Sequence, residues 1–131
     1  MDQTENGKAL AHHLGETYFQ AHRGAFIRGN ALVVFGNDGY QQDERARREV
    51  DAVLAWGKTQ GLRVTDFGTD PEDGYSWVLV FTGAKPDELA DLALAAEDVL
   101  WRAWHGDNPD PSQRAFEACQ RQQALLAGDE Q

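Results

Sequence analysis

Short apolar runs alternate with stretches of helical periodicity through the middle of the chain. Residues 31–35 form an apolar run with β-branched members that leads into the glycine-bounded segment 36–39, a pattern typical of a strand followed by a turn. After Asp43, which suits an N-cap, apolar positions recur on one helical stripe up to Gly61, which suits a C-terminal stop. The stripe comprises Ala46, Val50, Val53, Leu54 and Gly57. The pattern therefore predicts a strand and then a helix.

A pair of strands is expected after this helix. Residues 62–67 alternate between apolar and polar positions, as a half-exposed strand does, and residues 75–81 are mostly apolar. The intervening residues 69–74 are rich in turn formers. Together these segments predict a hairpin with a longer loop.

A second helix is predicted over residues 87–105. Pro86 suits the first turn, and Asp87 and Glu88 complement the positive end of the helix dipole. Gly106 stands where the helix should end. This helix would follow directly on the hairpin.

The N-terminal part of the chain leaves two alternatives. A helical face is formed by Leu10, Leu14, Tyr18, Ala21 and Ala25. Gly15 and Gly24 each disfavour a helix by about 1 kcal/mol. We expect a helix across residues 9–29, with a strand within residues 16–28 as the alternative.

The ends of the chain are assigned from their proline and helix-capping residues. Residues 107–111 contain two prolines and predict a linker, after which Ser112 can cap a last helix that runs to about Leu126. We expect residues 1–8 and 128–131 to be disordered. A chain of 131 residues is long enough for one domain and too short for two ordinary ones, so residues 1–131 are expected to form a single domain.

The order of elements predicts an α+β fold with a small mixed sheet. A crossover helix makes strands 31–35 and 62–67 parallel, and a hairpin makes strands 62–67 and 75–81 antiparallel. Placing strand 75–81 between the other two satisfies both conditions. The resulting β-α-β-β-α order is a partial ferredoxin-like plait with extra N-terminal and C-terminal helical segments. Its missing strand is either absent or contributed by the N-terminal segment.

Both faces of this sheet need a cover. Residues 31–35 and 77–81 are apolar at nearly every position, whereas a sheet open to water on one face would show alternation. The N-terminal segment, the last helix or the sheet of a second copy could supply the cover. A homodimer is therefore one of the expected arrangements.

Negative charge is concentrated in one part of the sequence. The chain carries 22 acidic against 12 basic residues, a net charge of −10, and between Asp66 and Asp110 acidic residues outnumber basic ones by eleven to two. Such a surface repels nucleic acid and anionic lipid and accelerates encounter with cationic partners. We therefore expect a basic protein partner and no direct contact with nucleic acid.

The second predicted helix carries a candidate binding surface. On a helical wheel Asp87, Asp91 and Asp98 share one stripe, and apolar side chains stand beside it, as in a hot spot for a basic protein. Including the preceding loop, the predicted partner-binding residues are Asp70, Glu72, Asp73, Asp87, Glu88, Asp91, Leu94, Asp98, Trp101 and Trp104. The competing interpretation is that the last helix covers Trp101 through Phe116, Cys119 and Leu126.

The residues give no pattern for metal binding or catalysis. His12, His13 and His22 do not share a helical face, and Cys119 is the only cysteine. Cys119 also lies in the middle of a predicted helix, where nothing lowers the pKa of its thiol. We therefore predict no metal site, no cofactor and no catalytic residue.

These observations favour a small acidic protein-binding module that occludes a basic partner. In the most specific form of this hypothesis, the partner is a protein that handles nucleic acid. Toxin-neutralising immunity proteins and phage inhibitors of CRISPR-type defence complexes (anti-CRISPR proteins) are of this physical kind. The absence of an apolar span, of a signal-peptide pattern and of a second cysteine predicts a cytoplasmic protein that does not enter a membrane.

Two alternatives remain at this point. One is a plait-type enzyme or small-ligand binder, with an aromatic pocket where Tyr18, His22, Tyr40 and Trp77 meet. The other is a housekeeping homodimer that uses the apolar sheet face as its interface.

Overall fold

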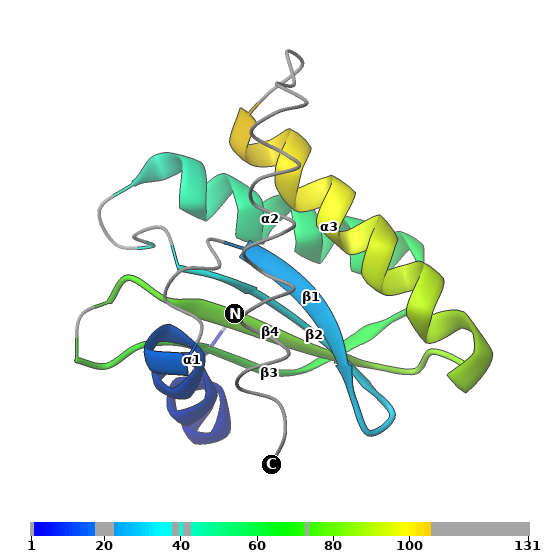
Figure 1. The fold of residues 1–131 in the computed structure, drawn as a ribbon, viewed down its shortest axis with the longest axis horizontal. Coiled ribbons are helices and arrows are strands. Elements are labelled where there is room, and N and C mark those ends of the chain that lie inside the picture. Colours follow the sequence, from blue (N-terminus) through cyan, green and yellow to red (C-terminus); the bar gives the residue numbers. More distant parts are fainter. Residues whose placement is uncertain (1, 18–22, 38–39, 41–42, 73, 106–131) are drawn as a thin grey trace.

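The computed structural model describes residues 2–17, 23–37, 40, 43–72 and 74–105. These residues form three α-helices, four β-strands and one short 3-10 turn (Figure 1). The elements in chain order are α1 (Glu5–Thr17), β1 (Arg23–Arg28), β2 (Ala31–Gly36), α2 (Glu44–Thr59), β3 (Arg63–Thr69), β4 (Trp77–Thr82), η1 (Pro86–Glu88) and α3 (Leu89–His105). None of these helices is both long and apolar enough to cross a lipid bilayer.

The four strands form one sheet in the order β1-β2-β4-β3, which confirms the predicted α+β class. β4 lies between β2 and β3, as the hairpin and the crossover together predict. β2 and β3 therefore run in the same direction without touching, and each hydrogen-bonded pair among the four strands is antiparallel. The expected mixed sheet is thus antiparallel at every one of these ladders. β1 occupies the position of the strand that the partial plait lacked.

The helix expected over residues 9–29 is corrected by the structure. α1 ends at Thr17, and β1 pairs with β2 along its whole length through a two-residue turn at Gly29 and Asn30. Gly29 has a φ of 62°, which glycine adopts at little cost and which suits such a turn. Strand pairing and this turn outweigh the apolar helical face that the sequence also offers.

The two predicted helices in the middle of the chain are confirmed. The carboxylate of Asp43 accepts a hydrogen bond from the backbone N–H of Arg45 at 2.8 Å, so Asp43 caps α2. Gly61 follows the helix with a φ of 74°. Pro86 opens the one-turn η1, which continues directly into α3. The last predicted helix, residues 112–126, lies outside the described residues.

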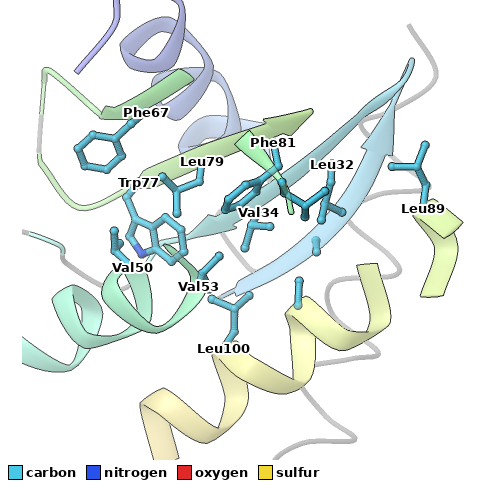
Figure 2. Packing of buried hydrophobic residues seen from close by; sticks show 13 residues of the cluster. Leu32, Val34, Val50, Val53, Phe67, Trp77, Leu79, Phe81, Leu89 and Leu100 are labelled. Carbon is cyan, nitrogen blue, oxygen red and sulfur yellow. The ribbon is translucent and has the colours of Figure 1, made fainter. Parts of the chain in front are cut away.

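The larger part of the core lies between the sheet and the helices α2 and α3, which cover the same face (Figure 1). Trp77 is fully buried there and lies beside Val50 and Val53 of α2 (Figure 2). The indole fits because Gly36 on the neighbouring strand has no side chain, and a Cβ at that position would overlap the ring. The buried members of this cluster are Ala25, Leu32, Val34, Val50, Val53, Leu62, Phe67, Trp77, Leu79, Phe81, Leu89, Ala96 and Leu100.

α1 packs on the opposite face of the sheet (Figure 1). Ala11 and Leu14 of this helix join a smaller buried cluster with side chains of three strands, namely Phe26, Val33, Phe35 and Val78. The sequence left three candidates for covering the sheet, and the N-terminal segment is the one that covers this face. The contact is also close at backbone level, because a Cβ on Gly7 would overlap the carbonyl of Phe67.

The residues that precede α1 are attached to the edge of β3. The backbone N–H of Thr4 donates to the carbonyl of Phe67 at 2.8 Å, and the hydroxyl of Thr4 donates to Asp66 at 2.7 Å. The same hydroxyl accepts from the N–H of Gly7 at 3.0 Å, which caps the helix. The Gln3 side chain accepts from the N–H of Thr69 at 2.9 Å. The expected disorder of residues 1–8 is therefore corrected, because residues 3–8 belong to this cap and to α1, whereas residues 128–131 lie outside the described part.

Candidate functional site

The acidic stretch of the sequence does not gather on one wall of the molecule. Asp66, Asp70 and Glu72 lie on β3 and the loop after it, beside α1. The acidic residues of η1 and α3 lie beyond the opposite face of the sheet (Figure 1). Asp73, Asp107 and Asp110 lie outside the described residues. The structure therefore separates the predicted partner-binding residues into two sites.

The first site is the α3 acidic patch, defined as Asp87, Glu88, Asp91 and Leu94. All four residues are exposed, and Leu94 leaves 67% of its surface in water. Asp91 precedes Leu94 by three residues, so their side chains are neighbours on the helix surface. None of the ion pairs found in the described part of the chain involves these carboxylates.

The second half of α3 is less negative than its first half. Asp98 forms an ion pair with Arg102, one helical turn later, with 2.9 Å between its Oδ2 and the Nε of the arginine. The carboxylate of Asp98 is thus balanced locally. The excess charge of this helix lies in its first turns and in η1.

Neither tryptophan is an exposed anchor beside this patch, and the expected exposure is corrected for Trp101. Trp101 is only 4% exposed, and its ring stacks on His105 with 3.8 Å between the ring centroids. The buried arc of α3 is wider than the ideal wheel predicts, and it includes Trp101 together with Leu100. Trp104 is half-buried, and the guanidinium carbons of Arg23 and Arg45 lie 4.6 Å and 4.3 Å from its ring centroid. The proposed cover of Trp101 by residues after 111 lies outside the described part.

A buried ion pair beneath this helix was missed by the sequence analysis. Glu49 of α2 is fully buried, Arg23 of β1 is 4% exposed, and their Oε2 and Nε atoms are 2.9 Å apart. The signal was present, because Glu49 falls on the same stripe as Ala46 and Val53. A charge on an apolar stripe indicates a buried partner, and β1 supplies it.

The second site is the His12 cluster, defined as His12, Glu16, Asp70 and Glu72. Asp70 was predicted to contact a partner, but only 3% of it is exposed. Its Oδ1 lies 3.1 Å from Nδ1 of His12 and accepts a hydrogen bond from the N–H of Glu72 at 2.9 Å. Backbone hydrogen bonds from Asp70 to Ser76 and from Gly74 to Asp70 hold the loop around it. Asp70 is therefore a structural support for the loop and for the imidazole.

The imidazole of His12 is surrounded by negative charge. Its Nε2 lies 3.3 Å from Glu16 and its Nδ1 lies 3.9 Å from Glu72, and both of these glutamates are exposed. The hydrogen bond with Asp70 raises the pKa of His12 above its ordinary value. The charges of the three carboxylates act in the same direction, while partial desolvation acts against them. The cluster thus favours a cationic occupant, whether a proton or another cation.

A hollow of about 300 Å³ adjoins this cluster. Its lining comes from the segment before α1, from α1 and from the loop between β3 and β4, and consists of Gln3, Lys8, Thr69, Asp70, Pro71, Glu72 and Gly74. A smaller hollow of about 90 Å³ lies at α2 and is lined by Tyr40, Val50, Asp51, Leu54 and Phe67. The larger hollow and the His12 cluster share Asp70 and Glu72.

The aromatic pocket expected around Trp77 is not formed by that residue. Its side chain is fully buried in the core, so it cannot line a space open to a ligand. Tyr40 is half-buried and meets the ring of Phe67 edge to face at 6.0 Å, at the smaller hollow. Tyr18 and His22 lie outside the described residues.

Comparison with protein-family models, with curated proteins and with solved structures finds no match to this chain. The two sites therefore rest on their own geometry. One is an exposed negative surface around a leucine, suited to a macromolecule. The other is an imidazole among carboxylates, suited to a small cation. The spacing of His12 and Glu16, four apart on a helix, was a sequence signal for the second site, but its remaining members come from a loop distant in sequence.

Proposed function

We propose that the protein binds a basic surface of another protein through the α3 acidic patch and thereby occludes that surface. The observation that carries this proposal is the exposure of Leu94 beside carboxylates that form no ion pair within the described residues. A leucine with 67% of its surface in water gains free energy when a partner covers it. The surrounding charges select a partner that is cationic at the rim of its contact.

The two parts of the patch would act at different stages of binding. Long-range attraction by Asp87, Glu88 and Asp91 accelerates the encounter with a cationic surface, and this effect weakens as salt is added. Burial of Leu94 acts at short range and slows dissociation. The same division explains why an acidic surface alone is insufficient, since charge at an exposed rim adds little affinity.

The specific form of this proposal is an inhibitor of a protein that handles nucleic acid. A basic surface that binds phosphates is also complementary to a row of carboxylates, so the α3 acidic patch can take the place of the phosphates. Immunity proteins that neutralise a toxin and anti-CRISPR proteins belong to this functional class. The prediction for this form is direct competition between the protein and nucleic acid for the same partner.

The proposal is tested with two variants of the full chain that change the net charge equally. In the first, Asp87, Glu88 and Asp91 are each replaced by lysine. In the matched control, three exposed acidic residues elsewhere are replaced by lysine: Asp2, Glu5 and Asp51. Proteins from the native host are captured on each immobilised variant at low salt and identified, and association rates of the captured partner are then measured over a range of salt concentrations.

The expected result is a basic protein that is captured by the wild type and the control and lost by the patch variant. Its association rate should fall with salt for the wild type and lose most of that dependence when the patch is reversed. Nucleic acid added before capture should prevent the basic protein from being captured. If the patch variant and the control capture the same proteins with equal association rates, the proposal is wrong.

A further inference from the structure

The His12 cluster has the composition of a metal site, although the sequence predicts none. One ligand atom from each of His12, Glu16 and Glu72 lies within 4.8 Å of the other two, the one such group among the described residues. Two ligands bound to the same zinc ion at about 2.0–2.2 Å are themselves close to 3.5 Å apart. Glu16 already lies 3.3 Å from Nε2 of His12, whereas Glu72 lies 3.9 Å from Nδ1 and must turn toward Nε2 to share an ion with them. Glu16 and Glu72 are 70% and 74% exposed and are free to make such movements.

Asp70 supplies the support that a ligating imidazole needs. A histidine that binds a metal through one ring nitrogen usually donates the other N–H to a carboxylate, which fixes its tautomer and orientation. Nδ1 of His12 lies 3.1 Å from Oδ1 of the buried Asp70, so the other nitrogen, Nε2, is directed toward Glu16 at 3.3 Å. The loop hydrogen bonds around Asp70 hold this arrangement in place.

The donor set selects the class of cation. One imidazole nitrogen with two carboxylate oxygens suits Zn²⁺ and similar first-row cations, whereas Mg²⁺ and Ca²⁺ prefer ligands that are all oxygen. Three protein ligands leave at least one coordination position for water. Lys8 lies one turn before His12 on α1, and its ammonium pairs with Glu5 at 3.5 Å.

We propose that His12, Glu16 and Glu72 bind a Zn²⁺-class divalent cation, with Asp70 as the positioning residue. The site joins α1 to the loop between β3 and β4, and it lies on the face of the sheet opposite the α3 acidic patch. It is therefore independent of the proposed partner binding. A bound ion would also fasten α1 to the loop, because its ligands come from both elements.

The test is a titration of the chelator-treated full chain with Zn²⁺ by calorimetry and with Co²⁺ by visible absorption. We expect one equivalent to bind, with Co²⁺ giving the bands of a site that contains nitrogen. Glu16→Gln and Glu72→Gln should each weaken binding at least tenfold, and Asp70→Asn by about 10–100-fold. His13→Gln, next to the cluster on α1, is the matched control and should bind like the wild type.

Glu16 and Glu72 are exposed, so their variants will fold and keep the test valid even if replacing His12 destabilises the chain. In the wild type, the ring nitrogen signals of His12 should shift on addition of Zn²⁺. The proposal is overturned if no saturable binding is seen, if the two glutamine variants bind as tightly as the wild type, or if Mg²⁺ competes equally. Reversal of the α3 acidic patch should leave Zn²⁺ binding unchanged, so this result is separate from the fate of the proposed function.

Discussion

The two faces of the sheet are covered in different ways. On one face α2 and α3 pack through large side chains, with Trp77, Phe81 and Leu100 all buried. On the other face α1 approaches so closely that Gly7 and Gly68 meet backbone to backbone, and the side-chain cluster is smaller. Large side chains can shift when a neighbour changes, whereas two backbones in contact cannot. We therefore expect the α1 face to be the less tolerant of added volume.

The acidic residues differ between the two faces in the same manner. Those of the α3 acidic patch are exposed and leave the charge available to a partner. On the α1 face Asp66 and Asp70 accept hydrogen bonds from Thr4 and His12, so their charge is used within the fold. Acidic residues that count equally toward the net charge thus have different roles. A carboxylate with a hydrogen-bond donor nearby in the fold is used for stability, and one without such a donor is available to a partner.

The largest predicted loss of stability comes from the buried ion pair on the α2 face. Replacing Glu49 by glutamine keeps the volume but removes the negative charge that lies 2.9 Å from the guanidinium of Arg23, which is 4% exposed. Removing one member of a buried pair costs about 3–5 kcal/mol. Urea denaturation should show a loss of this size.

The double variant Arg23→Met with Glu49→Leu is the control for this prediction. It removes both charges at once, so the two substitutions together should cost much less than the sum of the single ones. If Glu49→Gln costs less than about 1 kcal/mol, the pair is not the buried support that its geometry indicates.

The second prediction tests the contrast between the faces directly. A Cβ on Gly7 would overlap the backbone of Phe67 and Gly68, so Gly7→Ala must displace α1 from the sheet. We expect a destabilisation of about 3 kcal/mol, at the upper end for an overpacked site. On the other face a Cβ on Gly57 meets the ring of Phe81, a side chain that can rotate, so Gly57→Ala should cost less.

Gly29→Ala separates this steric effect from the loss of backbone freedom. Gly29 has a positive φ of 62°, and no atom lies within 4 Å of the position that a Cβ would take. Gly29→Ala should therefore lower the free energy of unfolding by about 1 kcal/mol, the cost of the left-handed backbone conformation alone. Equal losses for Gly7→Ala and Gly57→Ala would remove the distinction between the two faces.

The third prediction concerns the cap that attaches the N-terminal residues to β3. Thr4→Val keeps the shape of the side chain and removes the hydroxyl that bonds both Gly7 and Asp66. A lost N-cap costs about 1 kcal/mol. Hydrogen exchange should become faster in the first turn of α1 while α2 and α3 keep their protection, and uniform acceleration in all helices would contradict a local role.

The elements of the α2 face could be predicted from the sequence because their signals are local. Asp43 and Gly61 bracket α2, and the hairpin and crossover together fix β4 between β2 and β3. The start at Pro86 of the helical segment formed by η1 and α3 was equally clear. In each case the deciding interaction lies within a few residues or follows from chain connectivity.

The α1 face and the site on it could not be predicted, because their contacts are distant in sequence. β1 forms through pairing with β2, although Ala25 of this strand also continues the apolar helical face that begins at Leu10. The hydrogen bonds of Asp70 with His12 and of Asp66 with Thr4 join residues about sixty positions apart. The burial of Trp101 was likewise not visible on a helical wheel, which shows the direction of a side chain but not what covers it.

The smallest predicted effect on stability is at Leu94, and it distinguishes a surface kept for binding from one kept for folding. Leu94→Ala should change the free energy of unfolding by no more than about 0.5 kcal/mol, because the side chain is 67% exposed and alanine favours helix. Leu100→Ala, six residues later on the same helix and fully buried, should cost about 2–5 kcal/mol.

Partner binding should reverse this order. Leu94→Ala is expected to accelerate dissociation of a partner captured by the wild type while leaving its association rate unchanged, because the side chain acts only after encounter. Leu100→Ala, measured at a temperature where it remains folded, should leave both rates unchanged. Loss of stability at Leu94 comparable to that at Leu100 would mean that this leucine is covered within the protein itself, and the α3 acidic patch would then lack the apolar centre on which the proposed function depends.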